Sequence, residues 1–188
     1  MTLTDKPTAD VSVRLAWAAD APDIAAVQVT AWQQSYADVL PSHALAALPA
    51  DQFESRWRES ITHPKAARQR VLVALERAAL RGFVATAPAT DPDTDPVSDA
   101  EIAELVIDPR HRGVGHGSRL LHAAVDTMRS DRFARATIWL NSTDDDQRQF
   151  LVDQGWAPDG AHRELDLHGD GSVLVKQLRL HTALTRVD

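Results

Sequence analysis

The chain has 188 residues, of which 44% are hydrophobic, and 20 basic against 27 acidic residues give a formal net charge of −7. This length suits one domain with a sizeable core, and the lack of cysteine excludes disulfides, thiolate metal sites and a cysteine nucleophile. The acidic balance argues against nucleic-acid binding, while a polar N-terminus without a long apolar run predicts a cytoplasmic protein with no membrane partner.

The first third of the chain predicts one strand followed by helices. We expect residues 1–10 to be a disordered tail and residues 11–188 to form a single domain. Apolar and polar residues alternate over 11–15, which indicates a half-buried strand. Asp20 stands where it would cap a helix with regularly spaced apolar residues. A second short helix is predicted over residues 51–60.

The middle of the chain predicts a hairpin, an acidic loop and a further strand. Residues 70–76 and 81–87 are apolar runs with a short connection, which is typical of a β-hairpin. Residues 88–99 hold three prolines, four aspartates and no base, which indicates a solvated, mobile loop. Residues 100–107 are then expected to form a strand.

The last third predicts a helix, a strand, another helix and a second hairpin. The run over residues 136–140 is apolar enough for a fully buried strand. Ser142 or Thr143 can cap the helix that follows. Residues 163–167 and 173–180 flank a glycine turn, as in a hairpin. The order of elements predicts an α/β chain with a mostly antiparallel sheet.

The turn RHRGVGHG, residues 110–117, has the properties of a phosphate-binding site. Free N–H groups at a helix N-terminus and the helix dipole favour an anion, and glycines let a backbone approach it closely. From residue 108 to residue 122, three arginines against one aspartate give a local net charge of +2, to which three histidines can add. The glycine spacing fits neither a P-loop nor a dinucleotide fingerprint. The alternative is a structural turn that only caps the helix.

The segment ELVIDPRHRGVGHGSRLL resembles the acetyl-coenzyme A motif of the GNAT N-acetyltransferase superfamily. The core of that motif is Arg/Gln-x-x-Gly-x-Gly/Ala, where x is any residue. Its three defined positions are occupied here by Arg112, Gly115 and Gly117. QFLVDQGW, residues 149–156, is similar to the last helix of the family. The resemblance implies a GNAT-like α/β fold with a mixed, mostly antiparallel sheet of six to seven strands flanked by about four helices. It also implies an acetyl-coenzyme A-dependent N-acetyltransferase.

The resemblance implies acetyl-coenzyme A as co-substrate and no metal. Backbone amides of the turn would bind the pyrophosphate, and the preceding strand would pair with the pantetheine arm in a slot beside residues 136–140. Asn141 lies at the mouth of that slot, where it would bind the arm or cap the next helix. The implied cofactor-binding residues are Leu105, Val106, Ile107, Arg112, Gly113, Val114, Gly115, His116, Gly117, Ser118 and Asn141.

Glu101 is the predicted general base for direct attack of an amine on the thioester. Deprotonating an alkyl amine of pKa ~10 at pH 7 costs about 4 kcal/mol, and a nearby carboxylate can take the proton. Two-residue alternation places Glu101 on the face of Leu105 and Ile107 and leaves Glu104, the weaker candidate, on the other face. Several GNAT enzymes carry a catalytic glutamate at the position that Glu101 matches. The alternative is an ordinary solvent-facing acid.

Two further regions concern the group that would protonate the departing thiolate and the pocket that would bind the acceptor amine. Many GNAT enzymes place a tyrosine that protonates the thiolate where this chain has Leu151, which cannot donate a proton. A thiol of pKa roughly 8.5 can leave unaided, so the alternatives are acid-free catalysis and a coenzyme A-binding or sensing module without efficient turnover. Trp32 and Tyr36 resemble the acceptor-pocket region of one GNAT subgroup, or else belong to the core. The expected partner is a small-molecule or peptide amine, preferably cationic, and the family admits a homodimer.

Overall fold

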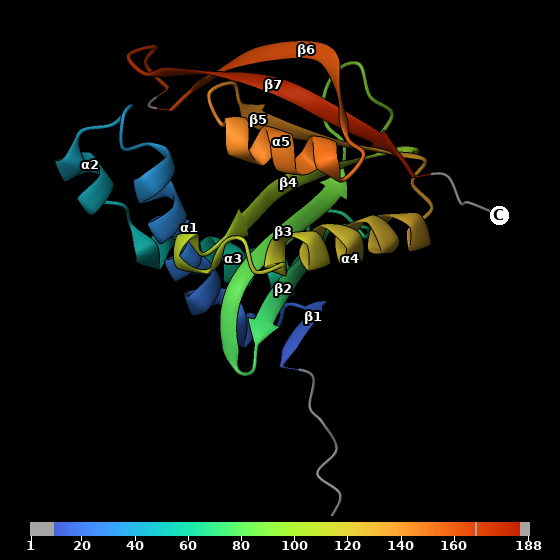
Figure 1. Ribbon diagram of the computed structural model, residues 1–188, viewed down its shortest axis with the longest axis horizontal. Coiled ribbons are helices and arrows are strands. Elements are labelled where there is room, and N and C mark those ends of the chain that lie inside the picture. The colour runs from blue at the N-terminus through green and yellow to red at the C-terminus, as the bar shows by residue number, and fades with distance from the viewer. Residues whose placement is uncertain (1–9, 168, 185–188) are drawn as a thin grey trace, which may run out of the picture.

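The computed structural model describes residues 10–167 and 169–184, and residues 1–9 of the expected tail lie outside this range. The described residues form one seven-stranded sheet with helices on both faces (Figure 1). The strand order is β1-β2-β3-β4-β5-β7-β6. Only the pair β4–β5 is parallel, and the other five neighbouring pairs are antiparallel.

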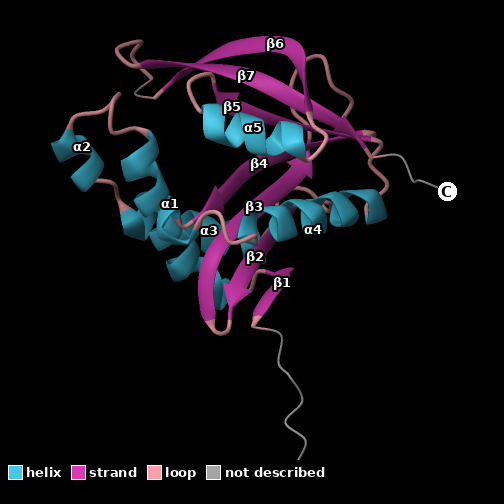
Figure 2. Ribbon diagram, viewed as in Figure 1, coloured by secondary structure: helices cyan, strands magenta, loops and turns pink. Residues whose placement is uncertain are grey.

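The elements follow the predicted order (Figure 2). The strands are β1 (Val11–Leu15), β2 (Arg70–Glu76), β3 (Ala79–Pro88), β4 (Asp99–Ile107), β5 (Arg135–Asn141), β6 (Ala157–Asp166) and β7 (Leu174–Ala183). The α-helices are α1 (Ala21–Ser35), α2 (Ser42–Ala46), α3 (Ala50–Thr62), α4 (His116–Ser130) and α5 (Asp145–Asp153). The α/β class and the mixed, mostly antiparallel sheet are confirmed. Within the described ranges, no helix is long and apolar enough to cross a membrane.

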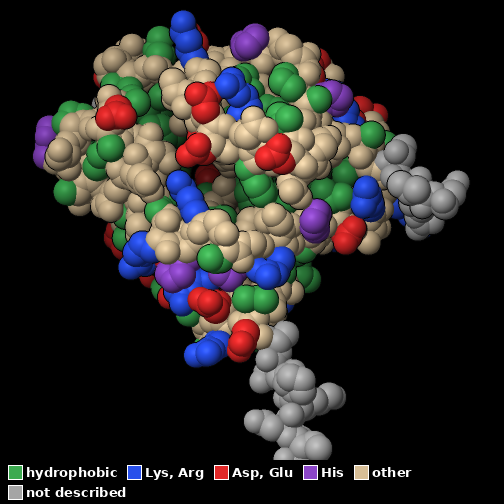
Figure 3. Space-filling view, viewed as in Figure 1, with side chains coloured by type: hydrophobic (Ala, Val, Ile, Leu, Met, Phe, Trp, Pro, Cys, Tyr) green, Lys and Arg blue, Asp and Glu red, His purple; other side chains and the backbone are tan. Residues whose placement is uncertain are grey.

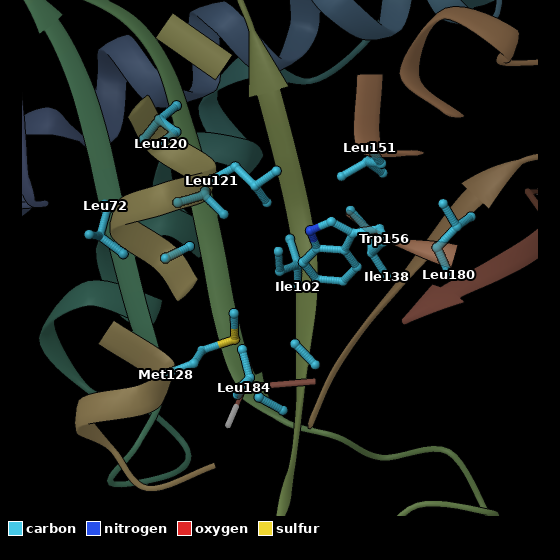
Figure 4. Close-up of a cluster of buried hydrophobic side chains, with 14 of the residues drawn as sticks. Leu72, Ile102, Leu120, Leu121, Met128, Ile138, Leu151, Trp156, Leu180 and Leu184 are labelled. Atoms are coloured by element: carbon cyan, nitrogen blue, oxygen red, sulfur yellow. The ribbon is translucent and has the colours of Figure 1, made fainter. Parts of the chain in front are cut away.

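Two hydrophobic cores lie on opposite faces of the sheet. α4 and α5 cover one face, where Met128, Leu151 and Trp156 are buried together (Figure 4). α1 and α3 cover the other face. Neighbouring residues of β3 serve different cores, since Phe83 packs under α3 and Val84 packs under α4. The alternation of a strand buried on both faces therefore decides which helices each residue meets.

A β-bulge interrupts this alternation in β4. In the register with β3, Thr86 pairs with Ile102 and Ala85 pairs with Glu104, so Ala103 has no partner of its own. One extra residue shifts every later side chain of the bulged strand to the other face. The sequence gives no local sign of this, because the bulge lies within an unbroken run of strand-forming residues.

The bulge overturns the predicted facing of one carboxylate. Glu104 does lie on the face opposite Leu105 and Ile107, as predicted. Glu101, however, shares the face of Glu104 and not that of Leu105, because its partner in β3, Ala87, is on the same side as Ala85. The bulge thus places both glutamates on the face of α1 and α3.

β4 and β5 separate along their length. They pair from Asp99 to Ile102 on one strand and from Arg135 to Ile138 on the other, and the pairing ends there. From Glu104 to Ile107, β3 is the one described strand with which β4 pairs. The sheet therefore opens at its centre, where a slot was expected.

Two predicted helix caps differ from the structure. Asp144, and not Ser142 or Thr143, caps α5, because its side chain accepts the N–H three residues along at 3.0 Å. Asp20 precedes α1 but does not cap it. Its carboxylate instead accepts a hydrogen bond from Arg14 Nη1 at 2.7 Å. An ion pair with a neighbouring strand here replaces the local cap.

The acidic loop between β3 and β4, predicted to be solvated and mobile, is anchored to β7. The side chain of Arg179 is 3% exposed, and its Nη1 donates to Asp91 at 3.1 Å and to Asp93 at 2.8 Å. Arg179 Nε also donates to Asp159 at 2.7 Å. A buried guanidinium with three carboxylates around it is a strong tether, so the loop is held against the sheet.

Candidate active site

A pocket of about 910 Å³ lies where β4 and β5 separate. Figure 3 shows this face of the molecule hollowed near its middle, with acidic and basic side chains around the opening. Most predicted site residues line the pocket: Trp32, Tyr36, Glu101, Leu105, Val106, Ile107, Arg112, Gly113, Gly115, Gly117, Ser118 and Asn141. Val114 and His116 do not line it.

The glycine turn before α4 has the backbone geometry of an anion site. Gly113 and Gly115 have φ values of +77° and +91°, in the left-handed region that glycine adopts most readily. Gly115 is the N-cap residue of α4, and no side chain caps the helix. The first N–H groups of a helix have no acceptor within it, so these donors are available to a bound anion.

Gly117 keeps a passage open between α4 and α5. A Cβ atom built on Gly117 would lie 3.4 Å from the ring of Phe150 and 3.7 Å from Ile107. A small residue fits there, but a longer side chain would extend into the pocket that Phe150 and Ile107 line. The glycine is therefore needed for space rather than for an unusual backbone angle.

The charged groups near the turn are not all free. Arg110 Nη2 donates to Asp108 at 2.8 Å, and this contact holds the pKa of the buried Asp108 carboxyl at about 2. His116 is 2% exposed, and neither ring nitrogen has a hydrogen-bond partner in the described structure. Burial lowers the pKa of His116, so this histidine stays neutral at pH 7 and adds no charge to the turn. Arg112 remains as a cation on the pocket wall.

Glu104 is the most perturbed carboxyl of the pocket. Gln28 Nε2 donates to Glu104 Oε1 at 3.2 Å, and Trp57 Nε1 donates to Gln28 Oε1 at 2.7 Å. Because an indole nitrogen can only donate, it turns the NH₂ group of the amide toward the carboxyl. Burial nevertheless raises the pKa of Glu104 to about 7. A group that titrates near neutral pH is well suited to accept a proton.

Glu101 also lines the pocket and is half-buried. Burial raises the pKa of its carboxyl as well, and the hydroxyl of Thr90 donates to Oε2 at 3.4 Å. Two carboxyls of the same strand thus line one space. Sequence reasoning ranked Glu104 below Glu101 and missed Gln28 and Trp57 altogether. A polar residue within the apolar stripe of α1 was the available signal for Gln28.

Tyr36 and Trp32 form the α1 side of the pocket. Their rings meet edge to face with centroids 5.7 Å apart, and Trp32 also packs against Phe53 at 5.2 Å. Burial raises the pKa of the Tyr36 phenol, and a hydrogen bond with Asn141 partly offsets this. Both interpretations of the sequence therefore hold, because the two aromatic residues border the pocket and also pack onto the core.

α5 does not present Leu151 to the pocket. Leu151 is fully buried in the core beneath the helix (Figure 4). Asp146, Gln147 and Phe150 are the residues of α5 that line the pocket. Gln147 Nε2 donates to the carbonyl of Leu105 at 3.3 Å. In the part of the chain that the structure describes, no group of three or more His, Asp or Glu is placed to hold a metal.

The sequence of the chain matches one family. Residues 29–155 match the family described as the acetyltransferase (GNAT) family. No curated protein matches the chain.

Several solved structures share the fold. A PaiA N-acetyltransferase from Thermoplasma acidophilum, in complex with coenzyme A, has a TM-score of 0.69 and 15% identity over 89% of this chain and 97% of that one. The putative acetyltransferase YncA from Salmonella typhimurium, with acetyl-coenzyme A, has a TM-score of 0.68 and 14% identity over 95% of this chain and 96% of that one. A ribosomal-protein-alanine N-acetyltransferase from Brucella melitensis has a TM-score of 0.70 and 16% identity over 92% of this chain and 99% of that one. Each of these similarities shows a shared fold and no more.

Proposed function

The chain belongs to the acetyltransferase (GNAT) family, and from this we propose that it moves the acetyl group of acetyl-coenzyme A onto a primary amine of a small molecule or peptide by direct attack. The observation that carries the proposal is the uncapped N-terminus of α4 beside the opening between β4 and β5. It joins a phosphate-binding geometry to a pocket that ends at two carboxyls.

The turn and the strand before it would bind the co-substrate. The free N–H groups from residue 113 to residue 118 suit a pyrophosphate, with Arg112 beside them. The edge over Leu105 to Ile107, with which no described strand pairs on the β5 side, suits the amide groups of the pantetheine arm. Acetyl-coenzyme A would supply the activated acetyl carbon. Acetyl-coenzyme A titrated into the protein in a calorimeter tests this step.

Two carboxyls can receive the proton of the amine. Glu101 is the base that the sequence predicts, and Glu104 has a pKa of about 7, which suits the role at neutral pH. Each can act directly or through a water molecule. We expect the Gln variant of the true base to lose about 10²-fold in turnover at neutral pH with little change in co-substrate affinity. Rate profiles of Glu101→Gln and Glu104→Gln against pH decide between the two.

Departure of the thiolate needs no group on α5 in this proposal. A thiolate whose conjugate acid has a pKa of roughly 8.5 is a tolerable leaving group. Asn141 and Tyr36 lie at the same part of the pocket and can bind the acceptor or the arm. Trp32 completes the aromatic wall.

The second candidate is a coenzyme A-binding or sensing module without efficient turnover. The observation that favours it is α5, which presents Phe150 and Gln147 where a proton donor would act. Thiol release from acetyl-coenzyme A with a panel of amines separates the two functions. Release with any amine supports the transferase, and tight binding without release supports the module.

A further inference from the structure

Three aspartates near the pocket are held in internal ion pairs. Asp91 and Asp93 bind Arg179. Asp159 binds Arg179 and Arg135, with Oδ2 2.8 Å from Arg135 Nη2. The acidic loop that holds Asp91 and Asp93 was one reason to expect a cationic acceptor from the sequence, together with a pocket glutamate and the net charge of −7. Because these two carboxylates face Arg179, the charge of the loop does not describe the pocket, and the side chains that line the pocket are the better guide to the acceptor.

Arg163 of β6 is the guanidinium that faces the pocket at its acceptor end. Its Cζ lies 4.3 Å from the ring centroid of Trp139, and its Nε donates to Gln177 at 2.7 Å. The nearest carboxylate among the described residues is Asp91, 4.0 Å from Nη1, which already accepts bonds from Arg179 and Trp139. Within the described ranges, neither Nη group of Arg163 makes a hydrogen bond.

This arrangement holds the guanidinium rigid and leaves its donor edge open. Stacking on an indole and one bond from Nε fix the plane of the group. A planar pair of N–H donors matches a carboxylate in bidentate geometry. The side chain of Arg163 is 43% exposed, so a ligand can reach it from solvent.

Arg163 lies on the same face of the sheet as the two pocket glutamates. It pairs with Gln177 in the register of β6 and β7, and Gln177 pairs with Asn141 of β5. Glu101 pairs with Thr137 of the same β5 face. The guanidinium lies over Trp139, one strand from β4. Paired strands are about 5 Å apart, and β4 and β5 diverge beyond Ile102 and Ile138. The pocket that Arg163 and the two glutamates line therefore has room for a compact zwitterion.

We propose that the acceptor is an amine that also carries a carboxylate, in the simplest case an amino acid, and that Arg163 binds this carboxylate while the amine faces Glu104 and Glu101. The inference rests on the proposed function and narrows it. A guanidinium on one side and two carboxyls on the other form a site whose charges complement a zwitterion. A polyamine would instead bring a second cation against Arg163.

The experiment compares matched acceptors on matched variants. Wild type, Arg163→Gln, Arg163→Lys and the control Arg148→Gln are assayed by thiol release with amino acids, their amides and their decarboxylated amines. Arg148 is an exposed residue of α5 that pairs with Asp145 and does not line the pocket. Its variant removes the same charge elsewhere. Circular dichroism and thermal melts verify the fold of each variant.

We expect wild type to prefer the amino acids over their amides in kcat/KM by about 10-fold or more, as for a hydrogen bond to a charged group. Arg163→Gln should abolish that preference by lowering kcat/KM for the amino acids about 10-fold more than for their amides. Arg163→Lys should restore only part of it, because lysine lacks the fork. Preference for decarboxylated amines, or an undiminished preference in Arg163→Gln, overturns the inference while the transferase function stands.

A binding measurement keeps the inference testable if no acceptor is acetylated. Calorimetry of an amino acid and of its amide with the coenzyme A-loaded protein then reports recognition without turnover. Binding of the amino acid that is lost in Arg163→Gln supports the carboxylate site even though the proposed activity fails. Equal binding of the two ligands, or of neither, overturns it.

Discussion

Replacing Glu104 by Gln should make the protein more stable at alkaline pH and less active. The carboxyl has a pKa of about 7 in the folded protein, against 4.5 for an unperturbed glutamate. At 1.36 kcal/mol per pKa unit, this difference corresponds to roughly 3 kcal/mol. Between these two pH values the folded protein holds a proton that the unfolded chain has released. Stability is therefore lost as the pH rises from about 4.5 through 7.

The variant Glu104→Gln has no proton to release and should escape this loss. Its amide oxygen can still accept the hydrogen bond of Gln28. Urea unfolding of wild type and variant between pH 5 and 9 measures the effect, with Glu59→Gln on the exposed surface of α3 as the control. The free energy of unfolding of Glu104→Gln relative to wild type should rise by up to about 3 kcal/mol across this range. Turnover of the same sample should fall if Glu104 is the base.

Parallel stability curves for wild type and Glu104→Gln would refute the reasoning, because a desolvated carboxyl must leave this signature. If water in the pocket partly solvates the carboxylate, its ionisation costs less free energy. The rise in the relative free energy of unfolding is then smaller but keeps the predicted sign. A rise in stability with full activity would separate the two roles. The carboxyl would then be perturbed by burial alone, and Glu101 would be the remaining base.

Three further predictions address the pocket and its support. Gly117→Asp should weaken acetyl-coenzyme A binding at least about 10-fold more than Gly117→Asn in a calorimeter, because only the aspartate repels a phosphate at close range; equal weakening would indicate bulk alone. Tyr36→Phe should raise KM for the amine and keep the plateau of the pH–rate profile, whereas a fall in kcat of about 10²-fold would make Tyr36 the acid. Arg179→Met should lower the free energy of unfolding by about 3 kcal/mol in urea titrations, since Asp91 and Asp159 lose a buried guanidinium and, among the described residues, keep only Trp139 and Arg135 as hydrogen-bonding side-chain partners; a loss below about 1 kcal/mol would contradict the tether.

Local patterns predicted the elements well, and contacts between distant residues account for what was missed. The bounds of β1 and β2 match the expected runs because alternation and apolar content are properties of neighbouring residues. The bulge at Ala103 depends on how β4 pairs with β3, so the face of Glu101 could not be predicted from spacing. The anchored acidic loop depends on Arg179, more than 80 residues away. The sequence predicted Ser142 or Thr143 as the cap of α5, and the cap is the next residue, Asp144.

The same contrast applies to the cofactor turn. Its glycines and arginines are contiguous, and a motif of contiguous residues can be recognised without knowing the fold. The rest of the pocket is lined by residues of α1, β4, β5, β6 and β7, which are far apart in the sequence. No spacing along the chain links Arg163 to Glu104. A site assembled from many strands has no sequence signature of its own.

The indole of Trp57 makes the acidity of a pocket carboxyl depend on a helix that does not line the pocket. With an apolar side chain at position 57, the amide of Gln28 is free to turn over and present its oxygen to Glu104. A carboxyl that faces a carbonyl oxygen keeps its proton to higher pH. The pH at which this pocket carboxyl loses its proton can therefore drift over evolutionary time through substitutions in α3, while every residue that lines the pocket stays the same.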